Sequence, residues 1–257
     1  MTVLVRDLFW GVSVDLADHK PQFVRFKARE LVRAYNEAVV AICEMLPSNL
    51  ARLVALRLEP GTYQSIDTIP KARIKPEPAT DLLGLQFIEA INNMGANGTT
   101  PGRSISVVDR DTLDGVDPDW HAKTGAVVQS FTHDPRFPKV FMVEPGVPAD
   151  TQVWIRAAFS AMPAKLEYPA LDDTAIWKVD GTGDALLGLP DEFENDVHAY
   201  MVARLSMKES KWADPAKAAR FTGVFTSSMN AKIEAQTGTN PNLKRLPISP
   251  EPLTAAQ

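Results

Sequence analysis

The hydrophobic period of the chain changes twice, and these changes constrain the fold more than any other sequence feature. Between residues 24 and 46, apolar residues recur at alternating spacings of four and three, at Leu31, Tyr35, Ala38, Ile42 and Met45. This spacing places them on one face of an α-helix. After Pro47 the pattern becomes that of short strands, and after Pro163 the helical period returns. We therefore expect an α+β protein with helices at both ends and strands between them.

Other signals define the remaining helices. Residues 3–17 repeat an apolar residue every four positions and are predicted to form the first helix. Residues 191–210 are predicted to form a later one. Asp214-Pro215 is typical of a helix start, because Asp caps the first N–H groups and Pro fits the first helical position. Gly238 is predicted to end this last helix.

The central region is predicted to hold strands joined by short turns. Their ranges are 53–58, 63–66, 85–93, 126–132, 139–144 and 151–159. Short turns favour antiparallel neighbours, since parallel strands need a long crossover. The first two ranges, joined by Glu59–Thr62, are predicted to form a strand–turn–strand unit. Glu144-Pro145-Gly146 is predicted to be the turn that precedes the last strand.

Together these signals predict a fold class and domain boundaries. The prediction is a helical bundle from the N- and C-terminal helices, with an inserted antiparallel β domain and an extended C-terminal tail. The boundaries are 1–50 and 190–238 for the helical bundle, 51–165 for the antiparallel β domain, 166–189 for a connecting loop region and 239–257 for the extended arm.

The arm is rich in proline, which excludes a helix and lowers the entropy that an extended segment loses on binding. Apolar and basic residues lie between its prolines. We predict that they bind a partner protein, and these residues are Leu243, Lys244, Arg245, Leu246 and Ile248.

Composition excludes several classes of function. The net charge of −5 argues against a general nucleic-acid binder, which would carry a basic footprint. No apolar run approaches the roughly 18 residues that span a bilayer, so we expect no membrane partner. Cys43 is the single cysteine, so an intrachain disulfide is impossible, and its place in an apolar helical pattern predicts a buried side chain.

No pattern of catalytic or ligand-binding residues is present. The four histidines, which include His133, lack the spacing of a helical metal site, and no glycine-rich phosphate loop occurs. An acidic cluster begins at Asp109, but Gly115 and Trp120 fall where a calcium loop needs other residues. We expect its aspartates to serve as helix caps and turns. We predict no enzymatic activity, no cofactor and no metal.

Several loops resemble those of one known family. The residues that carry this resemblance are Asn93-Met94-Gly95-Ala96-Asn97-Gly98, Thr100-Pro101-Gly102-Arg103, Val108-Asp109-Arg110-Asp111-Thr112-Leu113, Asp117-Pro118-Asp119-Trp120-His121, Phe131-Thr132-His133-Asp134-Pro135-Arg136 and Phe141-Met142-Val143-Glu144-Pro145. In this order they resemble the central part of the head-to-tail adaptor, or connector, proteins of short-tailed bacteriophages. The glycine-rich segment 178–190 is longer than expected for that family.

The resemblance implies a structural virion protein. Copies would form a homo-oligomeric ring, usually a dodecamer, between the portal protein and a tail or nozzle protein at the head–tail junction. Genomic DNA would pass through the ring's channel during ejection without sequence-specific binding, and the protein would be made in the host cytoplasm. The alternatives are another tail or collar subunit, such as a nozzle or gatekeeper component, and an enzyme on an unrecognised scaffold.

Overall fold

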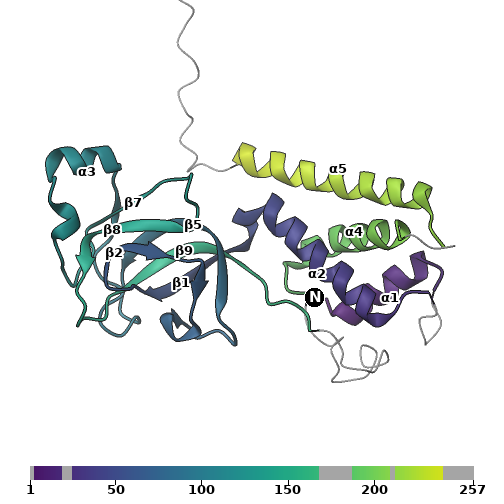
Figure 1. Cartoon of the computed structure of the whole chain (residues 1–257), viewed down its shortest axis with the longest axis horizontal. Coiled ribbons are helices and arrows are strands. Elements are labelled where there is room, and N and C mark those ends of the chain that lie inside the picture. The colour runs from purple at the N-terminus through teal and green to yellow at the C-terminus, as the bar shows by residue number, and fades with distance from the viewer. Residues whose placement is uncertain (1–2, 19–24, 168–186, 209–211, 240–257) are drawn as a thin grey trace, which may run out of the picture.

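The structure is a computed structural model that describes residues 3–18, 25–167, 187–208 and 212–239. It is elongated, with a helical part at one end and a β part at the other (Figure 1). The described residues form five α-helices, α1 Val5–Asp15, α2 Ala28–Met45, α3 Arg110–Val116, α4 Glu194–Ser206 and α5 Pro215–Thr239. Short 3₁₀ helices lie at Pro47–Leu50, Lys71–Arg73, Trp120–Ala122 and Asp191–Phe193.

Helix α4 is the centre of the helical part. It packs against α1, α2 and α5, and all four helices contribute to one apolar cluster. Helices α1 and α2 meet within that cluster at Phe9 and Tyr35, whose rings lie edge to face with centroids 6.0 Å apart. The stripe predicted for α2 is buried at Leu31, Tyr35 and Ile42, because burying one apolar face stabilises a helix far more than its intrinsic propensity does.

Helix α5 begins as its sequence predicts. Pro215 is its first residue, and the Asp214 carboxylate accepts a hydrogen bond from the backbone N–H of Lys217 at 2.9 Å. That bond satisfies one N–H group that the helix itself leaves unpaired. The predicted end at Gly238 lies within the helix, which runs to Thr239.

The β part contains two sheets. The five-stranded sheet has the order β3-β5-β9-β1-β4, with every neighbouring pair antiparallel. Its strands are Thr68–Ile69, Leu82–Asn93, Trp154–Met162, Ala51–Arg57 and Ile74–Lys75. The four-stranded sheet has the order β2-β8-β7-β6. Its strands are Gly61–Ser65, Val140–Val147, Ser130–His133 and Ser106–Val107.

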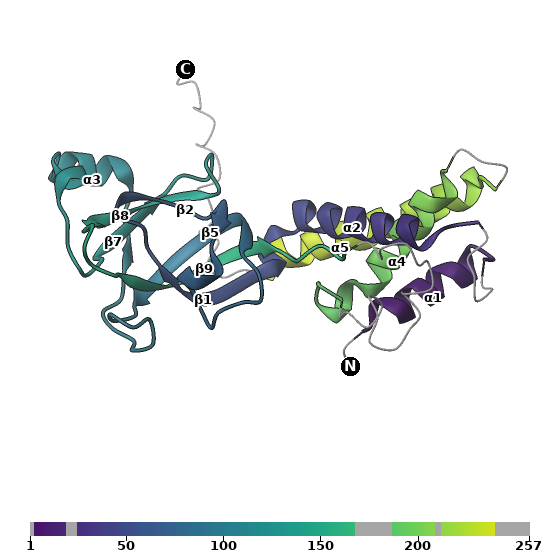
Figure 2. The ribbon, with the colours of Figure 1, turned by 60° about the horizontal axis from the view of Figure 1, so that its bottom comes forward.

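The two sheets face each other across a second apolar cluster. Phe87 from the five-stranded sheet stacks on Phe141 from the four-stranded sheet, with ring centroids 3.9 Å apart and planes 9° apart. Figure 2 shows the strands of both sheets wrapped around this interior. The alternation predicted for residues 151–159 is confirmed here, since Ile155, Ala157 and Phe159 are fully buried in the cluster.

The predicted fold class is wrong in its architecture. The protein is a mixed α+β structure with two sheets in a nearly closed, barrel-like β part, and no helical bundle with a simple antiparallel insertion describes it. The helices pack around α4, α3 lies in the β part, and β6 pairs with β7 in parallel. The spacing of hydrophobic residues indicates which segments form helices and which form strands, but it does not indicate which strands pair.

Two predicted pairings are also wrong. Strands β1 and β2 follow one another along the chain but lie in different sheets, and so do β8 and β9. Glu144, Pro145 and Gly146 lie inside β8. A short connection joins antiparallel neighbours only when both strands bury the same sheet face. Here each connection instead crosses from one sheet to the other, because both strands turn their apolar face to the shared interior.

One contact brings the connection between β2 and β3 very close to the backbone of β5. Ile66 directly follows β2, and its backbone carbonyl accepts a hydrogen bond from the N–H of Gly84 in β5 at 3.0 Å. A Cβ atom on Gly84 would lie 2.2 Å from that carbonyl oxygen and 2.9 Å from the Ile66 side chain. Only glycine therefore fits at position 84 without moving backbone.

We expect Gly84→Ala to lower the free energy of unfolding by about 3 kcal/mol, because the methyl group forces the two strands apart. Urea denaturation followed by circular dichroism measures this change. Gly115→Ala is the matched control, since no atom lies within 4 Å of a Cβ at that position. An equal loss of stability in both variants would contradict the role assigned to Gly84.

Candidate interaction sites

The predicted partner-binding residues lie outside the described part of the chain. Leu243, Lys244, Arg245, Leu246 and Ile248 all follow Thr239, where the description ends. The glycine-rich segment 178–190 is likewise described only from Leu187. Near the end of α5, the Gln236 side chain accepts a hydrogen bond from Ser48 at 3.0 Å, so α5 ends beside the junction between the helical and β parts.

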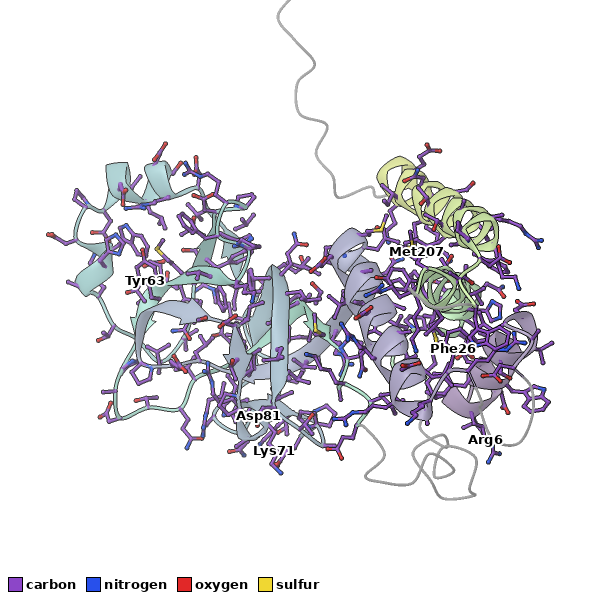
Figure 3. The ribbon with its side chains drawn as sticks, turned by 45° about the vertical axis from the view of Figure 1, so that its right-hand side comes forward. Arg6, Phe26, Tyr63, Lys71, Asp81 and Met207 are labelled. Carbon is purple, nitrogen blue, oxygen red and sulfur yellow. The ribbon has the colours of Figure 1, made fainter. Side chains whose placement is uncertain are left out.

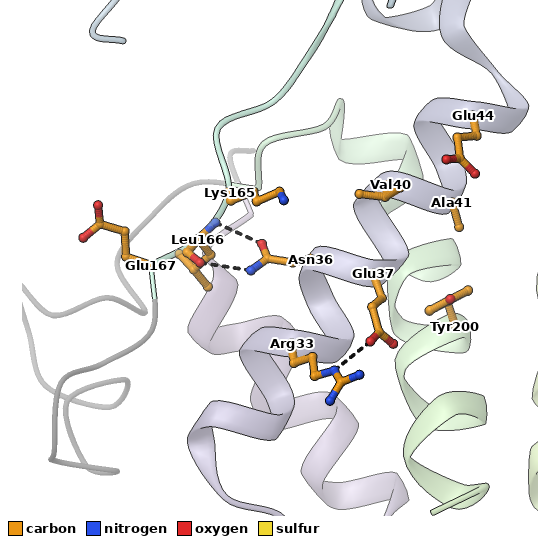
Figure 4. A pocket seen from close by; sticks show the side chains of 10 residues that line it. All are labelled: Arg33, Asn36, Glu37, Val40, Ala41, Glu44, Lys165, Leu166, Glu167 and Tyr200. Carbon is orange, nitrogen blue, oxygen red and sulfur yellow. Dashed lines mark hydrogen bonds and ion pairs between the residues drawn. The ribbon is translucent and has the colours of Figure 1, made fainter. Parts of the chain in front are cut away.

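A cleft of about 800 Å³ lies between α2, α4 and residues 165–167 (Figure 4). Glu37 lies at its centre and accepts hydrogen bonds from the Nε atoms of Arg33 and Arg204, each at 2.8 Å. Burial alone would raise the pKa of Glu37. The hydrogen bonds from Arg204 and Arg33 outweigh that effect and hold the pKa below its ordinary value. Glu37 therefore remains a carboxylate that ties α2 to α4.

The same cleft anchors the chain as it leaves the β part. The Asn36 amide donates to the backbone carbonyl of Leu166 and accepts from its N–H, both at 3.0 Å (Figure 4). On the next described segment, the N–H of Gly188 donates to the Tyr35 hydroxyl at 3.2 Å. Burial raises the pKa of Tyr35, so its hydroxyl stays neutral. We interpret this cleft as a structural junction, because its polar groups are used to hold backbone.

A second cleft, of about 680 Å³, lies between α3 and the outer face of the four-stranded sheet. Tyr63 of β2 and Thr132 of β7 both pair with Met142 of β8, so the three side chains form one row on that face. Tyr63 is 62% exposed and marks this face in Figure 3, and Phe137 at the edge of the cleft is also 62% exposed. We call this surface the α3 cleft.

Helix α3 is attached to the β part mainly through Trp120. None of the residues of α3 is buried, whereas Trp120 is fully buried and its indole N–H donates to the Asp114 carboxylate at 2.8 Å. Asp117 accepts a hydrogen bond from Lys123 at 2.5 Å. Asp114 and Asp117 of the acidic cluster therefore bind side chains of their own loop. Among the described residues, no group of three potential ligands could hold a metal ion.

The turn that closes the α3 cleft is stabilised by a bidentate ion pair. Arg136 donates to both carboxylate oxygens of Asp134, at 2.7 to 3.0 Å. The side-chain hydrogen bond from Arg136 is the main reason that the pKa of Asp134 falls to about 2. His133 contacts the backbone carbonyl of Val140 through Nδ1 at 2.9 Å. These contacts account for the His133-Asp134 pair as part of a turn.

The outer face of the five-stranded sheet is basic. Trp154 is 4% exposed there, with Lys75 Nζ 4.7 Å and Arg57 Cζ 5.9 Å from its ring centroid. The register places Lys75, Ala55 and Arg156 in one row across β4, β1 and β9. We call the part of this outer face that carries Arg57, Lys75 and Arg156 the basic face. One carboxylate, Glu89 of β5, lies farther along this face.

The sequence prediction for Cys43 is confirmed. Cys43 is buried, as predicted, and burial raises the pKa of its thiol to about 12, so it is a poor nucleophile. The helices of residues 3–18, 25–167, 187–208 and 212–239 include none with the length and hydropathy of a bilayer-spanning segment. The sequence did not predict the α3 cleft or the basic face, because each combines side chains from strands whose pairing was predicted wrongly or not at all.

A family model described as SU10 adaptor protein matches residues 6–245. The match covers nearly the whole chain, and it confirms the resemblance drawn from the loops between residues 93 and 145. No curated protein matches the chain.

The bond between Trp120 and Asp114 predicts a response to acid. The hydrogen bond from Trp120, with the charges of Arg110 and His121, lowers the pKa of Asp114 below its ordinary 3.8. A depressed pKa in the folded state means that the carboxylate stabilises the attachment of α3 fully above pH 3.8. We expect this stabilisation to be lost as the pH falls through the lowered pKa. The indole N–H resonance of Trp120 in ¹H–¹⁵N spectra should move over that range.

Asp114→Asn should abolish that titration, because the amide oxygen still accepts the hydrogen bond but carries no charge to lose. Asp111→Asn is the matched control, since Asp111 is exposed on the same helix and forms no ion pair with a described residue. A Trp120 resonance that titrates equally in both variants would show that another group controls α3.

Proposed function

Because the chain belongs to the SU10 adaptor protein family, we propose that it is a non-enzymatic virion subunit that joins head to tail in a phage particle. In this proposal, copies form a ring between the portal protein and a tail or nozzle protein, and genomic DNA passes through the ring. The family match is the observation that carries the proposal. The ring would lie at the head–tail junction after synthesis in the host cytoplasm.

The architecture supports a protein that connects two partners. Its helical and β parts have separate apolar cores, and the 3₁₀ helix Pro47–Leu50 connects them directly. Leu50, the last residue of that 3₁₀ helix, is buried in the helical core, and β1 begins at the next residue. The helical core and the first strand of the β part are therefore adjacent in the chain, with no linker between them. For this reason we expect the two parts to move as a rigid unit. A rigid unit can hold different partners at its two ends.

The arm supplies a means of reaching the portal protein. Residues 240–257 follow α5 and, if extended, would span roughly 60 Å. In this proposal Leu243, Leu246 and Ile248 enter apolar pockets of the portal, while Lys244 and Arg245 pair with its carboxylates. The prolines reduce the number of conformations available before binding, which lowers the entropic cost of docking.

The net charge of −5 supports a channel through which DNA moves without being held. Tight phosphate binding requires many neutralising lysine and arginine contacts, and this chain has more acidic than basic residues, 32 against 27. Sequence-specific readout is not part of the proposal. The proposal includes no cofactor and no membrane partner.

The test is to mix the purified chain with purified portal rings and to determine the composition of the product by electron microscopy and analytical ultracentrifugation. We expect the chain to be monomeric alone and to assemble as a ring on the portal. Truncation after Thr239 should abolish this binding, because it removes the residues proposed to anchor the arm.

A deletion of residues 254–257 is the matched control, since it shortens the arm but keeps all five proposed contact residues. Full binding by the chain that ends at Thr239 would overturn the role of the arm. A ring that forms without portal would instead favour another tail or collar subunit, such as a nozzle or gatekeeper component.

A further inference from the structure

We infer that neighbouring copies of this chain contact one another head to tail, with the basic face of one copy docked in the α3 cleft of the next. This inference rests on the proposed ring and specifies the surfaces that build it. Its basis is that the two outer faces of the β part carry opposite unpaired charges.

The basic face offers cations that the chain itself does not neutralise. Arg57 and Arg156 form no ion pair with any residue in the described ranges, and Lys75 donates to the backbone carbonyl of Asn97 at 2.5 Å, a neutral acceptor. Trp154 lies under Lys75 and Arg57 and is packed against Gly98, so closely that a Cβ there would lie 2.7 Å from the ring. Because the indole ring is tightly packed, it limits the movement of the two cationic side chains that lie over it.

The α3 cleft offers carboxylates that are also unpaired. Its two arginines are used internally, since Arg110 pairs with Asp114 at 3.4 Å and Arg136 pairs with Asp134 at 2.7 Å. Asp109 and Asp111 line the same cleft, are exposed, and make no ion pair within the described part of the chain. An unpaired acidic surface therefore remains at the start of α3.

Exposed aromatic side chains give the α3 cleft an apolar component. Tyr63 lies on its floor and Phe137 at its edge, and each is more than half exposed. Aromatic residues that are exposed in a monomer and ringed by charge are typical anchors of protein interfaces. On the opposite face, Leu53 is 57% exposed and occupies the same outer row as Ala158 and Glu89.

The two faces point in opposite directions. The inner faces of both sheets share one apolar cluster, so their outer faces must point away from each other. Figures 1 and 2 both place α3 and β1 on opposite sides of the β part. An interface between two different, oppositely directed surfaces is heterologous, and repeating it generates a ring when the rotation closes.

The charges favour this arrangement over a two-fold dimer. A two-fold contact would set the basic face against itself, or Asp109 and Asp111 against the same residues of the partner, and like charges at an interface cost binding energy. A head-to-tail contact pairs each cation with a carboxylate. A second copy of this chain is therefore the occupant that fits both faces at once.

Cross-linking between two exposed neutral positions tests the contact without changing any proposed charge. Thr112 lies on α3 beside Asp111, and Asn97 lies in the loop beside Lys75. The native Cys43 is buried, so only engineered cysteines should react. A chain with both Thr112→Cys and Asn97→Cys, assembled on portal rings and treated with a short thiol cross-linker, should give a ladder of multimers.

Each single cysteine variant should give only monomer, and an equal mixture of the two single variants should give dimers and nothing larger. Self-cross-linking of either single variant would show a two-fold contact and overturn the inference. Absence of the ladder from rings of normal composition would overturn it as well, while leaving the proposed function intact. If the wild-type chain forms no ring on the portal, the proposed function fails and the inference fails with it.

Charge reversal provides an independent measurement. Arg57→Glu with Arg156→Glu, or Asp109→Lys with Asp111→Lys, should each lower ring assembly about tenfold or more, because like charges would then oppose each other. All four substitutions in one chain should restore assembly, since every pair is again opposite in sign. Arg220→Glu with Glu44→Lys, both exposed on helices, is the control and should leave assembly unchanged. If both double variants are folded but the chain with all four substitutions still fails to assemble into rings, the proposed pairing of the basic face with the α3 cleft is contradicted.

Discussion

The structure of the β part depends on two sheets sharing one apolar interior. Phe87 and Phe141 stack face to face within it, and the bond between Gly84 and Ile66 attaches the connection between β2 and β3 to β5. Because both inner faces are buried together, β1 and β2 lie in different sheets although a short connection joins them, and so do β8 and β9. The same constraint decides which residues face outward, and so it creates the α3 cleft and the basic face.

The helical part depends on the β part through two backbone attachments. Residues 165–167, which follow β9, are held by the side chain of Asn36 on α2, and Pro47–Leu50 joins the end of α2 to β1. Helix α4 then connects the other helices, with Glu37 and Arg204 fixing its position against α2. Among the described residues, these contacts hold α2 and α4 together and attach the helical part to the β part.

The sequence predicted individual elements well and their arrangement poorly. The start of α5 was predictable because Asp214 and Pro215 act locally, and the buried faces of α2 and β9 followed from their periods. Strand pairing depends on burial shared between distant segments, so the turn at Glu59–Thr62 wrongly predicted a hairpin. The arm was predicted from composition alone, and the described residues do not test it. The sequence did not predict the two outer faces, because no local pattern indicates which face of a sheet packs against the other sheet and which is exposed.

The proposed ring would place two requirements on each subunit. Its lateral surfaces must remain soluble in the free chain and yet bind strongly once copies are brought together. Charged side chains that are exposed and unpaired meet both needs, because water solvates them in the monomer and a partner neutralises them in the assembly. In the proposed assembly, a single weak contact between faces would gain strength if a portal ring held many copies side by side, since each contact would then form at high effective concentration. If the proposed ring forms, opposite charges on opposite faces of the β part would therefore favour its assembly on a template over aggregation in solution.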